Sequence, residues 1–447
     1  MTKKILAAVL SLAVAAACFT ACGSDDSSSE SKADTNSSAA ETADSAADDA
    51  SAADTDSAAE LKAPVNDGAV DVTKGATDNM LTRSVLNEGD TSRLASKIKE
   101  ALDIANDDSL EVAQKTEKAT KVAFLGDSIT AGSAASSSQN QYTKQFISWW
   151  EENISYFVVG TNAGIGATDS YLAVHRVDSE VLADNPDIIF IEFINDVDND
   201  FYKTTMDSLI RKCLAQPNNP AVILVEMTME DGTCPQNVHS EIGEYYNVPI
   251  ISYHDAVLPE VEAGNIKWTD ISPDNIHPND DGHKMLAQML ENFVGGIKDN
   301  IDSVDTEAKA FDTSIESPTG DKYADAALED KNSKKVTVKD AGAFTEQTSP
   351  WNFQDGWAAS NGGSVTFEME FKNLGMLYYK TVDGKSGSAT VTIDGVECAE
   401  INADFTGGWG DYACNNEIVS FDEKGKHEVT VTVPEGKKFE ILRWMIS

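Results

Sequence analysis

Positive charge is scarce in this sequence. The 447 residues include 34 lysines and arginines against 75 aspartates and glutamates, so the formal net charge is −41 at pH 7. A chain with this balance repels the phosphates of nucleic acids and the anionic headgroups of lipids. The charge therefore excludes nucleic acid as the main partner. The length is sufficient for two or three domains with cores of their own.

Long apolar runs are missing from most of the chain. The run from Ile5 to Ala17 is too short to span a bilayer after export, and no later segment is apolar enough to cross one. Two lysines stand before this run and small residues follow it, which is the order of a secretory signal peptide. We therefore predict an exported protein.

Cys22 gives the export signal a more specific form. It follows Phe19-Thr-Ala, and small residues before a cysteine resemble a bacterial lipobox, in which the cysteine is lipidated and the preceding peptide removed. We predict a signal peptide over residues 1–22 and a protein that its lipid anchors to the bacterial cell membrane, at the cell surface. A plain secretory signal is the alternative, and Cys18 is a second candidate for the lipid.

Motifs for binding metals are absent as well. The chain has no H-E-x-x-H and no C-x-x-C pattern, and we predict neither a metal nor a cofactor. His239, His254 and His283 are expected to make local hydrogen bonds instead. Cys398 and Cys414 could pair in an exported protein, but sequence cannot test the distance between them, so that pairing stays open.

Composition and periodicity divide the rest of the chain into four parts. Residues 23–75 have almost no large apolar side chain, which predicts a disordered acidic linker of Ser, Ala and Asp. Residues 76–300 alternate short apolar strands with amphipathic helices, which predicts a parallel sheet covered on both faces. Residues 301–335 are predicted to be a second linker. Residues 336–447 alternate in polarity between turn signals and predict an all-β sandwich of the jelly-roll type.

The first candidate site lies in Lys121-Val-Ala-Phe-Leu-Gly126-Asp-Ser128. Val122 to Leu125 predicts a buried parallel strand, and Gly126 permits the sharp turn that ends it. Ligands bind at the carboxyl ends of such strands, where Ser128 could act as a nucleophile. The same residues could merely cap the next helix, an equally good interpretation of this stretch alone. A phosphate loop is disfavoured, because no Gly-Lys-Ser/Thr follows.

Three further stretches fall at predicted strand ends. In Asn162–Ser170, two glycines allow backbone N–H groups to face a ligand closely. Asn195 follows another strand, and its side-chain amide is a suitable donor to an oxyanion. Asp274 and His277 are three residues apart, so the carboxylate can hold the Nδ1–H group and leave Nε2 free as a base.

Together these residues supply the parts of a serine hydrolase site. Ser128 is the predicted nucleophile, His277 its general base and acid, and Asp274 the group that orients the imidazole. The predicted oxyanion donors are the N–H of Ser128, a backbone N–H near Gly166 or Ala167, and Asn195 Nδ2.

The four blocks, in this order, resemble the SGNH (GDSL) hydrolase family over about residues 120–297. The resemblance implies a flavodoxin-like three-layer α/β/α domain and an esterase or acylhydrolase that needs no metal. The stretch from Asn162 with His175-Arg176, and the stretch Asp274–His283, are similar to bacterial carbohydrate esterases that remove acetyl groups.

Two positions depart from the family pattern. Ala167 stands where the family usually has glycine, and Phe193 replaces the first residue of Gly-x-Asn-Asp. A backbone donor needs no particular side chain, so the first change is compatible with function. The second would narrow the pocket.

Tryptophans mark the C-terminal domain. Trp351, Trp357 and Trp409 lie in turn-rich parts, where a loop could expose them. Sugar rings stack on flat aromatic rings, so we predict that these side chains bind substrate. The alternative is that they belong to the edge of a core.

We therefore predict a lipid-anchored, two-domain esterase that hydrolyses acetyl esters on a polysaccharide or oligosaccharide, with this acetylated glycan as its partner. The first alternative is another acyl-ester hydrolase: a lipase, an arylesterase or a peptidoglycan O-acetylesterase. The second is a glycan-binding surface lipoprotein on a decayed hydrolase scaffold, against which the intact Ser128, Asp274 and His277 argue.

Overall fold

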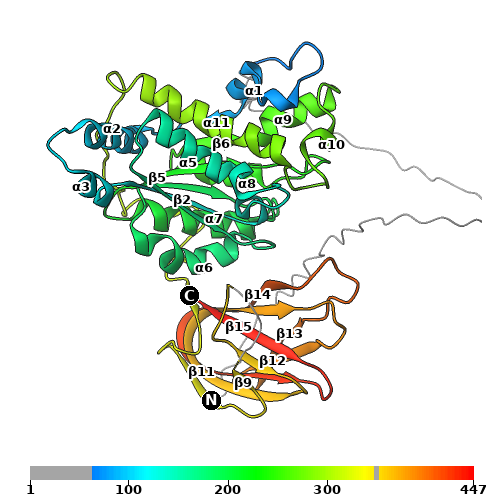
Figure 1. The fold of residues 1–447 in the computed structure, drawn as a ribbon. Coiled ribbons are helices and arrows are strands. Elements are labelled where there is room, and N and C mark those ends of the chain that lie inside the picture. Colours follow the sequence, from blue (N-terminus) through cyan, green and yellow to red (C-terminus); the bar gives the residue numbers. More distant parts are fainter. Residues whose placement is uncertain (1–62, 347–351) are drawn as a thin grey trace, which may run out of the picture. The chain divides into compact units, whose positions relative to one another are not determined.

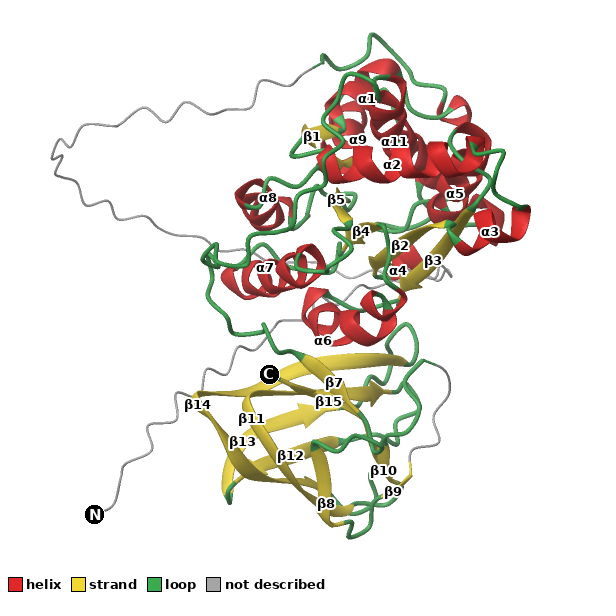
Figure 2. Ribbon diagram, turned by 90° about the vertical axis from the view of Figure 1, so that its left-hand side faces the viewer, coloured by secondary structure: helices red, strands yellow, loops and turns green. Residues whose placement is uncertain are grey.

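The computed structural model describes residues 63–346 and 352–447. The predicted signal peptide with Cys22, most of the predicted acidic linker, and Trp351 lie outside the described residues. The described residues belong to one compact unit. Along the chain an α/β part is followed by a β part, as the ribbons show (Figures 1 and 2).

A six-stranded sheet in the order β1-β6-β5-β4-β2-β3 forms the centre of the α/β part. Strands β2 to β6 run parallel, and β1 pairs antiparallel with β6 at one edge. The parallel order is that of a flavodoxin-like sheet, so the predicted fold class is confirmed. Its strands are β1 (Val85–Asn87), β2 (Thr120–Gly126), β3 (Val158–Gly164), β4 (Ile188–Glu192), β5 (Ala221–Glu226) and β6 (Ile250–Ser252).

Helices cover both faces of this sheet (Figure 1). In β2, Val122 and Phe124 enter the core that contains α2, α5, α9 and α11, whereas Ala123 and Leu125 enter the core that contains α6, α7 and α8. This alternation follows from the two-residue period of a strand. The helices are α1 (Asp78–Arg83), α2 (Ser92–Asn106), α3 (Val112–Glu117), α4 (Ser128–Ala131), α5 (Tyr142–Asn153), α6 (Ser170–Glu180), α7 (Asp200–Leu214), α8 (Gln236–Tyr245), α9 (Tyr253–Glu262), α10 (Trp268–Ile271) and α11 (Asp280–Asp299), with 3₁₀ turns η1 (Val72–Lys74), η2 (Ser138–Asn140) and η3 (Leu182–Asp184).

The carboxyl ends of the middle strands are level with one another. Gly126 at the end of β2 pairs with Gly164 of β3 on one side and with Glu192 of β4 on the other. The segments that follow these three strands therefore leave the sheet at the same edge. This register brings the nucleophile block and the two predicted oxyanion blocks to one place.

The β part is an antiparallel sheet with two very long strands, β11 (Gly363–Lys380) and β14 (Tyr412–Val433). The register between these strands shifts between Phe371 and Asn373 and again between Leu374 and Gly375, and bulges of this kind bend a sheet. The apolar sides of the strands share one core, which contains Phe367, Val431 and Trp444. The other strands are β7 (Ala327–Glu329), β8 (Val336–Asp340), β9 (Thr345–Glu346), β10 (Trp357–Ala359), β12 (Ser388–Ile393), β13 (Val396–Asn402) and β15 (Phe439–Ile446) (Figure 2).

The two predicted linkers are partly packed. Residues 63–75 lie against the α/β part, where the backbone N–H and side-chain amide of Asn66 both donate to Glu260. In the second linker, Asp207 of α7 accepts hydrogen bonds from Ser317 and Thr319, and Tyr323 is fully buried. Among the described residues, none of the helices combines the length and the apolar character needed to cross a bilayer.

Candidate active site

Ser128 stands at the first position of the short helix α4, directly after β2. A Cβ on Gly126 would lie 2.7 Å from the carbonyl oxygen of Glu192, so only glycine fits at the end of the strand. The Asp127 carboxylate caps the helix by accepting from the N–H of Ile129 at 3.0 Å. The two interpretations of this stretch therefore apply to different residues, since Asp127 is the cap and the Ser128 hydroxyl is left to face another side chain.

That side chain is His277. Its Nε2 lies 2.9 Å from Ser128 Oγ, and its Nδ1 lies 2.8 Å from Asp274 Oδ2. The other carboxylate oxygen, Asp274 Oδ1, accepts from the N–H groups of His277 and Ile276 at 2.7 and 2.9 Å. The structure thus brings together all three predicted triad residues in hydrogen-bonding order.

The hydrogen bonds of Asp274 also set its charge. Partial burial acts to raise the pKa of this carboxyl, but the hydrogen bonds from His277 and Ile276 outweigh it, and the net pKa lies below its ordinary value. Asp274 therefore stays ionised in mildly acidic solution. A carboxylate in this position fixes the imidazole as the tautomer with a proton on Nδ1 and a free Nε2.

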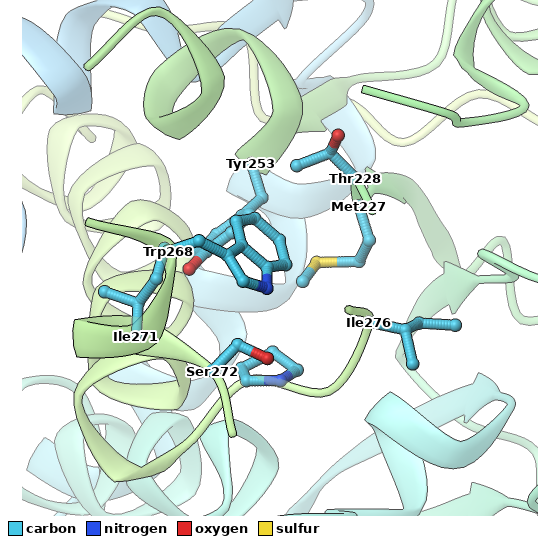
Figure 3. Close-up of a pocket in the computed structure, with 8 residues that line it drawn as sticks. Met227, Thr228, Tyr253, Trp268, Ile271, Ser272 and Ile276 are labelled. Atoms are coloured by element: carbon cyan, nitrogen blue, oxygen red, sulfur yellow. The ribbon is translucent and has the colours of Figure 1, made fainter. Parts of the chain in front are cut away.

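The backbone of the loop that carries Asp274 and His277 is held by hydrogen bonds to its carbonyl oxygens. Trp268 Nε1 donates to the Asp274 carbonyl oxygen at 2.6 Å, and Ser272 Oγ lies 2.6 and 2.7 Å from the Asp274 and His277 carbonyl oxygens. Figure 3 shows the small pocket in which Trp268 and Ser272 face one another, while the side chain of Ile276 points away from the Trp268 ring. Trp268 and Ser272 thus support the loop through hydrogen bonds to its carbonyl oxygens.

The predicted oxyanion residues lie beside Ser128. A Cβ on Gly166 would lie 3.7 Å from the Ser128 Cβ, which places this backbone directly against the nucleophile. Ala167 has a φ of 60°, a left-handed conformation that glycine adopts at less cost, which fits the glycine of the family pattern described above. Asn195 is tied to the same loop, because its Nδ2 donates to the Thr168 carbonyl oxygen at 3.1 Å.

Residues 124–285 match the model of the GDSL-like Lipase/Acylhydrolase family. This matched segment is therefore similar to GDSL-like hydrolases. The chain is also similar to two crystal structures of a two-domain esterase (CEX) active on acetylated mannans, one of them co-crystallized with mannopentaose. Both are 28% identical with a TM-score of 0.70, and the match covers 81% of this chain and 97% or 98% of theirs. No curated protein matches the chain by sequence.

Four carboxyl groups lie at or after the ends of β2, β3 and β4: the buried Asp127, Glu192 and Asp196, and the partly buried Asp169. Burial raises the pKa of Glu192 to about 7, although hydrogen bonds from Thr130 and Ile194 oppose the shift. Burial and the neighbouring Glu192 raise the pKa of Asp127 well above its ordinary value. Sequence analysis missed Glu192, although a single acid inside an apolar strand is itself a signal of a partnered buried group.

Asp169 belongs to the loop after β3 that carries Gly166 and Ala167, which we call the oxyanion loop, and connects it to neighbouring elements. Its carboxylate caps α6 through the N–H of Leu172, accepts from the hydroxyl of Tyr202 at 3.2 Å, and accepts from Asn415 Nδ2 of the β part at 2.9 Å. Asp169 lies two residues beyond Ala167. The β part therefore touches the segment that carries a predicted oxyanion donor.

The Asp169→Asn substitution is expected to stabilise the protein more strongly as the pH rises. Burial, followed by the charge of Asp196, raises the pKa of Asp169 to about 6, against about 3.9 in an unfolded chain. The folded protein holds this proton more tightly, so its free energy of unfolding falls between about pH 4 and pH 6, and the whole penalty is present above pH 6. Asparagine removes the charge and still caps the helix.

Denaturant unfolding at pH 4.5 and 7.5 measures this effect. The stability gained by Asp169→Asn should be larger by about 1–3 kcal/mol at the higher pH. The exposed Asp302→Asn substitution serves as the control and should show the same difference from wild type at both values. A gain for Asp169→Asn that does not change with pH would contradict the assignment.

The tryptophans of the β part divide into two kinds. Trp357 is only 7% exposed and packs edge-to-face on Phe367, with ring centroids 5.0 Å apart, so it belongs to the core and the structure contradicts its predicted place on the surface. Trp409 is 61% exposed and lies 4.9 Å from the ring of Tyr412 and 5.8 Å from that of Phe405. Only Trp409 of the described pair offers a ring face to solvent.

The described cysteines Cys213, Cys234, Cys398 and Cys414 are all free, so the pairing left open for the last two is not formed. Within residues 63–346 and 352–447 no group of His, Cys, Asp and Glu side chains is arranged to hold a metal ion.

Proposed function

We propose that this protein is a serine esterase that removes acetyl groups from a polysaccharide or oligosaccharide. The observation that carries the proposal is the hydrogen-bonded series Ser128–His277–Asp274 at the carboxyl edge of the sheet in a GDSL-like domain. The similar two-domain esterase is active on acetylated mannans, which makes acetylated mannan the first glycan to test.

The proposed reaction has two steps. His277 Nε2 takes the proton of Ser128 Oγ as that oxygen attacks the acetyl carbonyl carbon. The tetrahedral intermediate collapses, the sugar oxygen leaves with the proton from His277, and the acetyl group stays on Ser128. Water, deprotonated by the same imidazole, then attacks this ester. The bond from Ser128 Oγ to the acetyl carbon breaks, Oγ takes the proton from His277, and acetic acid is released and ionises to acetate.

The negative charge on the carbonyl oxygen needs donors that are already in place. In this proposal the donors are the N–H groups of Ser128 and of Gly166 or Ala167, together with Asn195 Nδ2. Their positions are supported by the contact of Gly166 with Ser128 and by the bond from Asn195 to the same loop. Such donors stabilise the intermediate more than the ground-state ester.

Two experiments test the reaction class. A fluorophosphonate should label Ser128 stoichiometrically, with the site located by peptide mass spectrometry, and absence of an adduct would favour a binding protein on a hydrolase scaffold. A series of 4-nitrophenyl esters should show highest kcat/KM for acetate. Preference for long acyl chains would support a lipase and contradict the acetyl specificity.

Trp409 is the described side chain best suited to hold the glycan. Its exposed ring can stack on a sugar, so Trp409→Ala should raise KM for an acetylated polysaccharide about 3- to 10-fold and leave KM for 4-nitrophenyl acetate unchanged. Tyr156→Ala, which removes another exposed aromatic ring, is the control and should change neither value. An unchanged KM for the polymer in Trp409→Ala would contradict this role.

We also propose that the protein is exported and anchored at the cell surface. The segment around Cys22 supports export and a lipid anchor at the cell surface. Labelled fatty acid should be incorporated into the wild-type protein but not into Cys22→Ser, and equal labelling of both would overturn the assignment of Cys22.

A further inference from the structure

A fully buried histidine lies between two carboxyl groups, one of which directly follows Asn195 of the predicted oxyanion hole. His239 of α8 places Nε2 3.0 Å from Asp196 Oδ2 and Nδ1 3.1 Å from Glu226 Oε2. Asp196 follows β4 and Glu226 ends β5, so the imidazole bridges the carboxyl ends of two neighbouring strands. The exposed fractions are 1% for His239, 1% for Glu226 and 4% for Asp196, so none of the three can act as a surface group.

The imidazole and the two carboxyl groups affect one another's protonation. Burial raises the pKa of Asp196 above its ordinary value, and the hydrogen bond from His239 opposes that shift. Burial acts to lower the pKa of His239, but Glu226 and Asp196 outweigh it and raise that pKa to about 10. The ring therefore stays an imidazolium at neutral pH and donates both protons. Glu226 Oε1 has no hydrogen-bond partner among the described residues, so the contact of Oε2 with His239 is the one that holds this side chain.

Asp196 in turn connects the two segments of the predicted oxyanion hole. We call these segments its arms: one carries Asn195, and the other carries Gly166 and Ala167. It directly follows Asn195, and its Oδ1 accepts from the N–H of Ser170 at 2.9 Å. Ser170 is the first residue of α6 and lies three positions beyond Ala167. The two arms also contact each other, through the bond from Asn195 Nδ2 to the Thr168 carbonyl oxygen. One carboxylate thus fixes the ends of both segments that would donate to the oxyanion.

We propose that His239 is a positioning residue for the esterase reaction, which acts by holding Asp196 as a fixed carboxylate and, through it, the arms that carry Asn195 and Ala167. This inference rests on the proposed function. His239 does not touch Ser128 or the substrate. Its loss should therefore weaken stabilisation of the intermediate and leave binding of the ground-state ester intact.

The test is His239→Gln assayed with 4-nitrophenyl acetate. Glutamine can still hydrogen-bond but carries no charge, so kcat should fall about 10- to 100-fold while KM stays within about twofold. The matched control is His254→Gln, because His254 also pairs with a carboxylate, Asp255 at 2.8 Å, and also has a pKa raised to about 10. The control should keep the wild-type kcat, since His254 contacts neither arm.

A double-mutant cycle separates positioning from general support of the fold. Because His239 is argued to act through Asp196, the variant His239→Gln/Asp196→Asn should lose no more kcat than the worse single variant. Losses that multiply would overturn the inference, and so would an unchanged kcat in His239→Gln. If His239→Gln fails to fold, Glu226→Gln gives the second test: a lower kcat at constant KM supports the inference, and an unchanged kcat overturns it.

The outcome for Ser128 keeps this inference distinct from the proposed function. If Ser128→Ala abolishes activity and His239→Gln keeps full kcat, only the positioning role of His239 is wrong. If Ser128→Ala keeps its activity, the proposed function itself is wrong.

Discussion

Replacing Ser128 with alanine should lower kcat for an acetyl ester by about 10⁴-fold or more. The hydroxyl is 2.9 Å from His277 Nε2, and the structure offers no other described hydroxyl bonded to that nitrogen. Without the oxygen no acetyl-enzyme can form, and the remaining donors can only assist direct attack by water. The rate of 4-nitrophenolate release from 4-nitrophenyl acetate, measured with active enzyme and variant at equal concentration, checks this expectation.

The loss must be one of chemistry rather than of folding. Ser128 makes few contacts that alanine would lose, so the melting temperature of the variant should stay close to that of wild type. Ser303→Ala, at an exposed turn after α11, is the matched control and should keep full activity. A Ser128→Ala variant with more than a few per cent of wild-type kcat would contradict the assignment of the nucleophile.

The second large effect is expected for Asp274→Asn, which should lower kcat about 10³- to 10⁴-fold at neutral pH. The reason lies in the two oxygens of Asp274. Oδ1 accepts from two backbone N–H groups, of His277 and Ile276, so the carbonyl oxygen of an asparagine must take that position. The NH₂ group then faces His277 Nδ1 and can bond only to a ring nitrogen without a proton. The proton moves to Nε2, which can no longer accept one from Ser128.

The same geometry supplies the control for this variant. Asp274→Ala leaves the imidazole free to choose its tautomer, so it should retain more activity than Asp274→Asn. Asp270→Asn, at an exposed position of α10, should behave as wild type. If Asp274→Asn is as active as wild type, the carboxylate does not set the tautomer and another group orients His277.

The sequence patterns predicted the parts of the site that local rules determine. The end of β2 at Gly126 and the spacing of Asp274 and His277 are visible in short stretches, and alternating strands and helices predict which stretches share an edge of the sheet. The contact between Ser128 and His277 joins residues 149 positions apart, yet it follows from the order of the strands. The left-handed Ala167 was noticed only as a departure from glycine, because no local pattern shows the sign of φ.

The features that the sequence did not predict depend on contacts between residues far apart in the chain. His239 was predicted to make local hydrogen bonds, and this was wrong, since Asp196 is 43 residues away from it. The bond from Asn415 to Asp169 joins residues 246 positions apart and links the β part to the oxyanion loop. Trp357 was predicted at the surface because its stretch is rich in turns, whereas its own ring packs in the core. In each case tertiary packing, which the local sequence does not encode, decided the outcome.

The role of Ser128 in deacetylation is measured by the acetate released from acetylated mannan, with wild type and Ser128→Ala compared at equal concentration. We expect steady release of acetate by the wild-type protein, none by Ser128→Ala, and none from mannan that has been chemically deacetylated beforehand. Equal release by both proteins would show that Ser128 is not the nucleophile. Failure of the wild type to release acetate from mannan or any other acetylated glycan, together with rapid hydrolysis of long-chain esters, would contradict the proposed function.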